Sequence, residues 1–226
     1  NLGQFETAIA QVYDQEDVTN NNSDAQGDSV IFDDSSLVHT NFVATTGDRA
    51  YLPLSSYEKL KLALEARLNE YNESNAIMDL VLFKQAMLHV TRISRIIQNP
   101  AGNAMLIGVG GSGKQSLCRL AAYINDFEVR QLPISSTFKV EDLLDELRDM
   151  YISTGVKGNR IVFLVADSDI VDEEFLVYIN AILTRGWIPN LLSKENIDSA
   201  LGSIASSAKV EGIPDVREAR LSYLMS

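Results

Sequence analysis

The sequence has little of what secreted, membrane-spanning or metal-binding proteins usually need. Cys118 is the single cysteine in 226 residues, which excludes an intramolecular disulfide and favours a reducing compartment. No apolar run approaches the length of a membrane-spanning helix, and the first residues are polar and acidic, unlike a secretory signal. The two histidines, His39 and His89, lie too far apart in sequence to suggest a metal site. We therefore expect a cytoplasmic protein with no membrane partner.

Positive charge is absent from the first 48 residues. This segment holds nine of the 31 acidic residues and no lysine or arginine, whereas the rest has 22 acids against 19 bases. Such an acidic segment repels phosphate backbones, so we expect no nucleic-acid partner. Residues 19–29 contain no apolar side chain larger than alanine and are expected to form a flexible loop. We interpret residues 1–50 as an acidic N-terminal extension, partly helical and partly irregular.

Two amphipathic helices are predicted between residues 51 and 100. The first begins after Pro53 and the two serines at 55 and 56, and the polar run of residues 69–75 is expected to break it. The second runs from about Ile77 to Gln98, with apolar residues recurring at helical spacing. We interpret residues 51–100 as a helical lead-in to the domain that follows.

From residue 101 onward, strand-like and helix-like segments alternate. Short apolar runs predict strands at 104–109, 127–132 and 161–166. Amphipathic patterns predict helices at 114–124, 140–151, 172–184 and 194–207, with the start of another near the end of the sequence. This alternation is typical of a parallel α/β sheet flanked by helices, which we expect residues 101–226 to form in part.

Glycines cluster where the first of these strands meets the first helix. Residues 108–115 read GVGGSGKQ, which matches the phosphate-binding P-loop pattern G-x-x-x-x-G-K-[ST] (Walker A) at every position but the last. In such a loop, backbone N–H groups and a helix N-terminus surround a phosphate, and the lysine reaches its oxygens. A glycine-rich turn that binds nothing is the alternative. The predicted nucleotide-binding residues are Gly108, Val109, Gly110, Gly111, Ser112, Gly113, Lys114, Gln115 and Ser116.

Two positions depart from the pattern of a hydrolytic site. A serine or threonine normally follows the lysine and ligates Mg²⁺, but Gln115 offers only an amide oxygen on a longer stem. The apolar run IVFLVA ends at Asp167, a Walker B acid, so Gln115 and Asp167 are the candidates for weak or indirect Mg²⁺ binding. Ser168 follows where a carboxylate base is expected, and a serine hydroxyl cannot accept a proton from water at neutral pH. Asp169 could replace that base only if the backbone bulges.

The sequence around these motifs resembles a known family. Two stretches, LNEYNESNAIMDLVLFKQAMLHVTRISRIIQNPAGNAMLIGVGGSGKQSLCRLAAYI and IVFLVADSDIVDEEFLVYINAILTRGWIPNLLSKENID, are similar to the fourth AAA+ module of dynein heavy chains. The form GVGGSGKQSL resembles the axonemal type. The resemblance covers about residues 50–200 and implies a P-loop NTPase (AAA+) sheet of strand order 5-1-4-3-2. The strand between the P-loop strand and the Walker B strand is not found here, so we expect an incomplete sheet.

The resemblance also implies a setting: a ring of AAA+ modules in one heavy chain, in the axoneme of a cilium or flagellum. The implied ligands are ATP or ADP and Mg²⁺, and microtubules are reached through the whole motor rather than through this segment. Residues 79–83 resemble the stretch that lies against adenine, which makes Leu80 and Val81 candidates for that wall, with plain helix-core residues as the alternative.

Three functions remain open at this point. The first is a regulatory module that binds nucleotide with weak or no hydrolysis. The second is a competent ATPase in which Gln115 and Asp169 replace the usual groups. The third is a structural ring module that binds no nucleotide.

Overall fold

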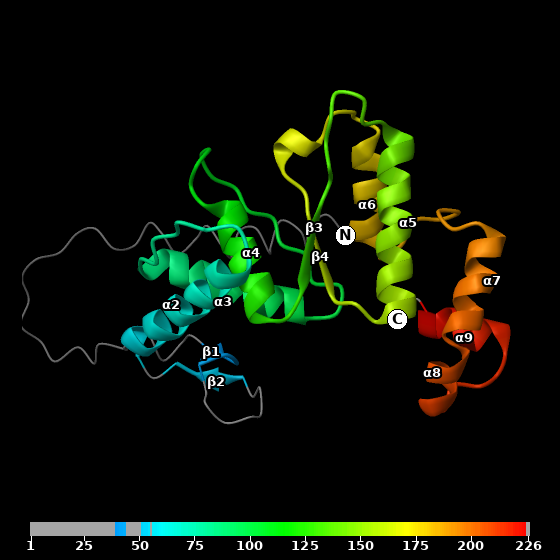
Figure 1. The fold of residues 1–226 in the computed structure, drawn as a ribbon, viewed down its shortest axis with the longest axis horizontal. Helices are drawn as coiled ribbons and strands as arrows, with labels where there is room; N and C mark the ends of the chain where they lie inside the picture. Colours follow the sequence, from blue (N-terminus) through cyan, green and yellow to red (C-terminus); the bar gives the residue numbers. More distant parts are fainter. Residues whose placement is uncertain (1–38, 44–50, 55, 225–226) are drawn as a thin grey trace, which may run out of the picture. The chain divides into compact units, whose positions relative to one another are not determined.

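The structure is a computed structural model that describes residues 39–43, 51–54 and 56–224. The predictions made for residues 1–38, including the loop at 19–29, lie outside the described residues. Figure 1 labels the α-helices and strands. The elements follow one another as β1 (His39–Thr40), β2 (Leu52–Pro53), α2 (Tyr57–Ser74), α3 (Lys84–Gln98), α4 (Lys114–Ile124), β3 (Glu128–Gln131), α5 (Val140–Lys157), β4 (Ile161–Leu164), the 3₁₀ turn η2 (Asp167–Asp169), α6 (Phe175–Arg185), α7 (Lys194–Ser203), α8 (Ala205–Val210) and α9 (Arg217–Leu224).

Helix α2 begins after a serine that caps it. Ser56 is the N-cap residue, and its hydroxyl accepts a hydrogen bond from the Lys59 N–H at 3.2 Å. This bond satisfies one of the N–H groups that have no partner inside a helix. The predicted break at residues 69–75 is wrong, because Leu68 and Tyr71 continue the packed face of the helix and it ends only at Ser74.

The segment between α2 and α3 is extended, so the helix predicted to start at Ile77 begins instead at Lys84. The cause is Asn72 near the end of α2. Its side chain accepts the N–H of Met78 at 2.8 Å and donates to the carbonyl of Met78 at 3.2 Å. These two bonds use the backbone groups with which Met78 would otherwise continue a helix.

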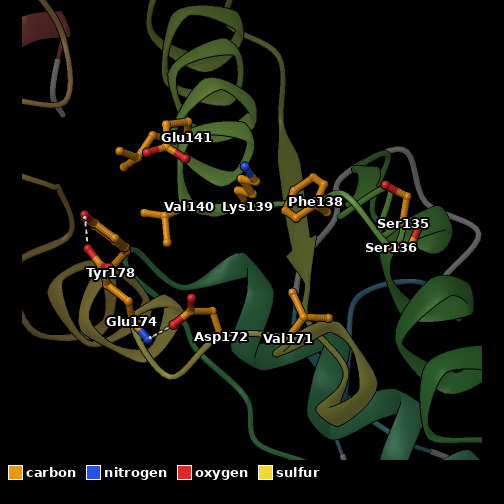
Figure 2. A pocket seen from close by; sticks show the side chains of 11 residues that line it. Ser135, Ser136, Phe138, Lys139, Val140, Glu141, Val171, Asp172, Glu174 and Tyr178 are labelled. Carbon is orange, nitrogen blue, oxygen red and sulfur yellow. Dashed lines mark hydrogen bonds between the residues drawn. The ribbon is translucent and has the colours of Figure 1, made fainter.

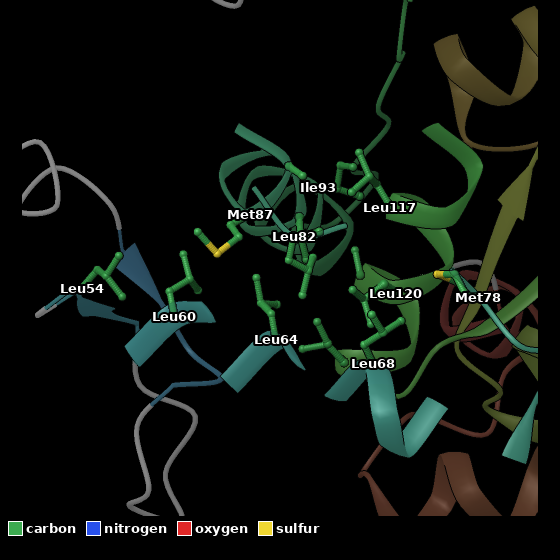
Figure 3. Close-up of a cluster of buried hydrophobic side chains, with 14 residues drawn as sticks. Leu54, Leu60, Leu64, Leu68, Met78, Leu82, Met87, Ile93, Leu117 and Leu120 are labelled. Atoms are coloured by element: carbon green, nitrogen blue, oxygen red, sulfur yellow. The ribbon is translucent and has the colours of Figure 1, made fainter. Parts of the chain in front are cut away.

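Helices α2, α3 and α4 share one apolar core, drawn in Figure 3. Leu60, Leu64, Val90 and Leu120 are fully buried in it. Burying a side chain of this size stabilises the fold by about 2 kcal/mol. A buried polar contact joins α3 to the end of α4, where the amide of Asn125 donates to the Ser94 hydroxyl at 2.7 Å. This core holds α4, the helix that follows the phosphate loop.

Strands β3 and β4 form a small parallel sheet. β3 pairs with β4 in the register Glu128 with Ile161 through Gln131 with Leu164. Both strands are shorter than the apolar runs that predict them. Helices α5 and α6 contribute Leu143, Leu147 and Phe175 to the second apolar core, and partly buried residues of β4 pack against it. α5 extends beyond its predicted end at residue 151 and ends at Gly158, whose backbone is left-handed.

The first predicted strand, residues 104–109, is not a strand in the structure. It was expected to be buried, yet Met105, Ile107 and Val109 are 70%, 62% and 78% exposed. A strand is stabilised by pairing, and among the described residues β3 and β4 pair only with each other. The described part of the chain is therefore α/β and helix-rich, with small sheets rather than a complete P-loop sheet. None of its helices is both long and apolar enough to cross a membrane.

Candidate nucleotide site

The phosphate loop leads directly into α4, and the predicted helix Lys114–Ile124 is confirmed at both ends. Gly113 is the N-cap residue, with a left-handed backbone at φ 78°, and Gly111 is also left-handed at φ 77°. Residues with a Cβ atom rarely adopt this conformation, so glycine at these two positions allows the loop to turn into the helix.

Lys114 folds back over the loop that precedes it. Its Nζ atom donates to the carbonyls of Gly108 at 2.6 Å and Val109 at 2.7 Å, and to the Ser112 hydroxyl at 3.3 Å. These three acceptors are uncharged oxygens. A phosphate oxygen is a stronger acceptor for an ammonium group because the hydrogen bond is then assisted by both charges. An anion at the loop can therefore replace these oxygens as the hydrogen-bond partner of the Lys114 ammonium group.

The N-terminus of α4 adds to this positive potential. Its first intrahelical bond runs from the Leu117 N–H to the Gly113 carbonyl at 2.9 Å. The N–H groups of Lys114, Gln115 and Ser116 precede that bond, and no side chain of the cap residue bonds to them. The end of a helix with such N–H groups attracts anions through these donors and through the helix dipole. The residues present therefore fit the phosphates of a nucleotide.

Leu80 lies beside the loop, whereas Val81 points to solvent. A Cβ atom on Gly113 would be 3.5 Å from Leu80 Cδ1, and Leu80 also packs against the first apolar core. Val81 is 73% exposed. Both residues precede α3, so neither lies in a helix, but Leu80 does belong to the packing around the core. Contact with adenine stays a prediction for both, and the structure brings only Leu80 against the loop.

The Walker B segment ends in a short 3₁₀ turn. Asp167 and Ser168 are exposed in this turn, and Asp169 is buried at 6% exposure. The Asp169 carboxylate accepts the N–H of Ala166 at 2.9 Å and the side-chain amide of Gln131 at 3.1 Å. Asp169 thus links the turn to the residue that precedes it and to β3.

The structure also connects this turn to the phosphate-loop helix, a contact that sequence reasoning missed. Arg119 on α4 donates from Nη2 to the side-chain oxygen of Gln131 at 2.6 Å, and Gln131 in turn donates to Asp169. No motif marks either residue. Arg119 lies inside a predicted helix and Gln131 inside a predicted strand, so the sequence alone gives no signal that the two side chains meet.

The donors available to Mg²⁺ are few. Gln115 and Asp167 are both exposed and supply an amide and a carboxylate oxygen, the hard donors that Mg²⁺ prefers. The described residues contain no group of three or more histidine, cysteine, aspartate or glutamate side chains that could hold a metal ion. Mg²⁺ would thus be held mainly by phosphate oxygens and water, with Asp167 and Gln115 contributing weakly.

A cavity of about 650 Å³ lies elsewhere, where β3 and β4 lead into the helices that follow (Figure 2). It shares no residue with the phosphate loop. Inside it the Tyr178 hydroxyl donates to Glu174 at 3.1 Å, and the pKa of Tyr178 is raised by burial and then by the hydrogen bond and charge of Glu174. The lining residues are Ser135, Ser136, Phe138, Lys139, Val140, Glu141, Leu144, Val171, Asp172, Glu174 and Tyr178.

Comparison with known proteins gives consistent matches. The family model described as "P-loop containing dynein motor region D4" matches residues 78–226. The chain is 47% identical over 205 residues to "Dynein beta chain, flagellar outer arm" of Chlamydomonas reinhardtii, which covers 89% of this chain and 4% of that protein. It is 46% identical over 186 residues to the "Dynein alpha chain, flagellar outer arm" of the same organism, covering 82% of this chain and 4% of that protein.

A third relative comes from a mammal. The chain is 44% identical over 191 residues to "Dynein axonemal heavy chain 11" of Sus scrofa, with 84% of this chain and 4% of that protein covered. The chain thus spans about 4% of the length of these relatives.

Proposed function

The chain belongs to the family of the P-loop-containing dynein motor region D4, and we propose that it is a nucleotide-binding AAA+ module, the fourth in its ring, of an axonemal dynein heavy chain. The names of its relatives place it in the axoneme of a cilium or flagellum. Its role is regulatory: it holds ATP or ADP within a microtubule motor and hydrolyses it weakly or not at all.

The observation that carries this proposal is the geometry of the phosphate loop. Lys114 lies within reach of the loop carbonyls, and the glycine N-cap leaves the N-terminus of α4 open to an anion. On nucleotide binding, Lys114 would exchange its carbonyl partners for phosphate oxygens, and the N–H groups of the first turn would complete the shell. Leu80 supplies an apolar surface beside the loop for the base or ribose.

The proposal of weak hydrolysis rests on the 3₁₀ turn. Ser168 is exposed at the position of the expected base, and its hydroxyl cannot deprotonate water. The next carboxylate after it in sequence, Asp169, is buried and accepts three hydrogen bonds within the protein, one of them from Ser168 itself. Bound Mg²⁺ would neutralise phosphate charge, while Gln115 and Asp167 would orient its waters. Attack by water would lack a general base.

The partners follow from the size of the relatives. Because the chain spans about 4% of their length, most of any motor lies outside it. We infer that its direct partners are the neighbouring AAA+ modules of the same heavy chain, and that microtubules bind the motor elsewhere.

Nucleotide binding can be tested in the intact heavy-chain motor by photolabelling with an azido-ATP and mapping the labelled peptides. Lys114→Ala should weaken labelling of this module roughly 100-fold, since a lysine–phosphate contact is worth about 3 kcal/mol. Lys59→Ala, which removes an exposed lysine of α2, is the matched control and should change nothing.

Each alternative function has its own outcome in this assay. Absence of label in a folded wild-type motor would show a structural ring module that binds no nucleotide. In a motor whose other phosphate loops are inactivated, labelling with steady phosphate release that disappears in Lys114→Ala would show a competent ATPase. In the same motor, labelling without phosphate release supports the regulatory module.

A further inference from the structure

Three side chains form a continuous chain of hydrogen bonds between the phosphate-loop helix and the Walker B turn. Arg119 on α4 donates to the side-chain oxygen of Gln131 at 2.6 Å, and the Gln131 amide donates to Asp169 at 3.1 Å. Asp169 closes the chain by accepting the N–H of Ala166 at 2.9 Å. We call Arg119, Gln131 and Asp169 the polar relay.

Because the relay is largely buried, its charged groups need hydrogen-bond partners within the protein. Asp169 is 6% exposed, and Arg119 and Gln131 are half-buried. A carboxylate withdrawn from water is stable only when hydrogen-bond donors and a positive charge compensate it. Two N–H donors reach Asp169 directly, and the charge of Arg119 acts through Gln131. Because the amide has one acceptor and one donor side, Gln131 can link the two charged groups in only one orientation.

The ends of the relay lie close to both halves of the candidate site. Arg119 lies on the same helix as Lys114, within the eleven residues of α4. At the other end, Ala166 directly precedes Asp167, the exposed Walker B acid. A rotation or shift of α4 on phosphate binding therefore moves Arg119, and the relay restrains the residue next to Asp167.

We propose that Gln131 is a positioning residue that couples nucleotide occupancy of the phosphate loop to the conformation of the Asp167 turn, through Arg119 on one side and Asp169 on the other. This rests on the proposed nucleotide binding and extends it. Asp169 is then an anchor of the turn rather than a catalytic base. The coupling needs no hydrolysis, which suits a module that reports on bound nucleotide.

The chemistry of the relay permits an isosteric design. Gln131→Leu removes both contacts of Gln131. Gln131→Glu keeps the shape of the side chain and an acceptor for Arg119, but it sets a second carboxylate against Asp169. Asp169→Asn is the conservative variant, because one oxygen of Asp169 accepts both hydrogen bonds and the asparagine oxygen can accept both in its place. A residue that merely fills space would tolerate Gln131→Glu. Gln85→Leu, at an exposed glutamine of α3, is the matched control.

Peptide-resolved hydrogen exchange on the intact heavy-chain motor, with and without an ATP analogue and Mg²⁺, measures both ends of the relay. Peptides over residues 108–118 report binding, and peptides over 164–172 report the turn, where the Ala166, Asp169 and Ile170 amides are hydrogen-bonded. In wild type and Gln85→Leu, nucleotide should slow exchange at both ends. In Gln131→Leu and Gln131→Glu, binding should remain while the turn exchanges about five-fold faster and loses its response. Asp169→Asn should keep the response.

The failures are distinguishable. If the turn still responds to nucleotide in both Gln131 variants, the coupling is wrong and nucleotide binding stands. If the Gln131 variants lose protection at both ends, Gln131 supports the fold of the site and the coupling is again wrong. If Asp169→Asn binds nucleotide but loses the response of the turn, the hydrogen bonds of the relay do not carry the coupling. If wild type shows no protection at residues 108–118, the proposed function and the inference both fall.

Discussion

The two halves of the candidate site are built by different means. The phosphate loop is a backbone structure: two left-handed glycines, a helix N-terminus and one lysine that contacts main-chain carbonyls. The Asp167 turn is held by side chains, with Asp169 bonded to its own turn and to Gln131 of another strand. The first half depends on a short local sequence, and the second on contacts between residues far apart in the chain.

This difference bears on function. The half made from backbone keeps nearly every feature needed to hold a phosphate, with Gln115 as its one departure. The half made from side chains has Ser168 in place of a base and an aspartate that is bonded within the protein. Under the proposed function the module binds nucleotide and lacks a base to activate water, and mutations can separate the two.

The largest effect is expected from restoring the missing chemistry. The double change Gln115→Thr and Ser168→Glu supplies a hydroxyl for Mg²⁺ and a carboxylate base, and Ser168 is exposed, so the new charge stays hydrated. A positioned general base commonly contributes a factor of at least about 100, so phosphate release should rise by about that factor. Release is measured in a motor whose other phosphate loops are inactivated.

The control for this gain is Ser207→Glu, which adds a carboxylate at an exposed serine of α8. It should leave phosphate release at the wild-type level. An unchanged rate in the double variant, with nucleotide still bound, would show that the two departures are not what limits hydrolysis.

A smaller effect is expected from removing the anchor of the turn. Asp169→Ala leaves the Ala166 N–H and the Gln131 amide without their acceptor, which should cost about 2 kcal/mol. Amide exchange in residues 164–170 should then be roughly 30-fold faster, without any change in phosphate release. Asp149→Ala, which removes an exposed ion-pair partner of Arg130, should change exchange little. A loss of phosphate release in Asp169→Ala would instead identify that residue as a base.

The same logic predicts a moderate effect in the phosphate loop. Gly113→Ala forces a residue with a Cβ atom into the left-handed region, which should destabilise the first turn of α4 by about 1 kcal/mol. The added methyl would lie 3.5 Å from Leu80, an ordinary contact, so the cost is conformational rather than steric. Thermal unfolding and exchange in residues 113–118 would measure it. Gly110→Ala, at a glycine without a positive φ and in open space, should leave the fold unchanged.

The contrast also explains what the sequence could predict. The helix at 114–124 was predicted at both ends, because the glycines, the lysine and the amphipathic pattern all act locally. The start of α3 was misplaced because Asn72 bonds to Met78, a contact between side chain and backbone that no periodicity reveals. Residues 104–109 have the composition of a buried strand, but burial depends on a neighbouring strand rather than on their own sequence.

The Asp167 turn shows the same limit within the site. An apolar run ending in Asp167 predicts the place of the Walker B acid, and β4 does end just before it. The burial of Asp169 could not be predicted, because its partner Gln131 is distant in sequence and joins it only when β3 pairs with β4. Side-chain networks of this kind depend on the tertiary fold.

The smallest expected effect concerns the cavity beyond β3 and β4. Burial, followed by the hydrogen bond and charge of Glu174, raises the pKa of Tyr178, since a tyrosinate would stand beside the carboxylates of Glu174 and Glu141. Glu174→Gln removes one of these charges and should lower the pKa of Tyr178 without returning it fully to the ordinary value, because burial and Glu141 remain. Absorbance titration against a Tyr178→Phe reference isolates this tyrosine, and Glu195→Gln on α7 is the control. An unchanged pKa in Glu174→Gln would mean that burial and Glu141 set it, and that the charge of Glu174 does not act on Tyr178.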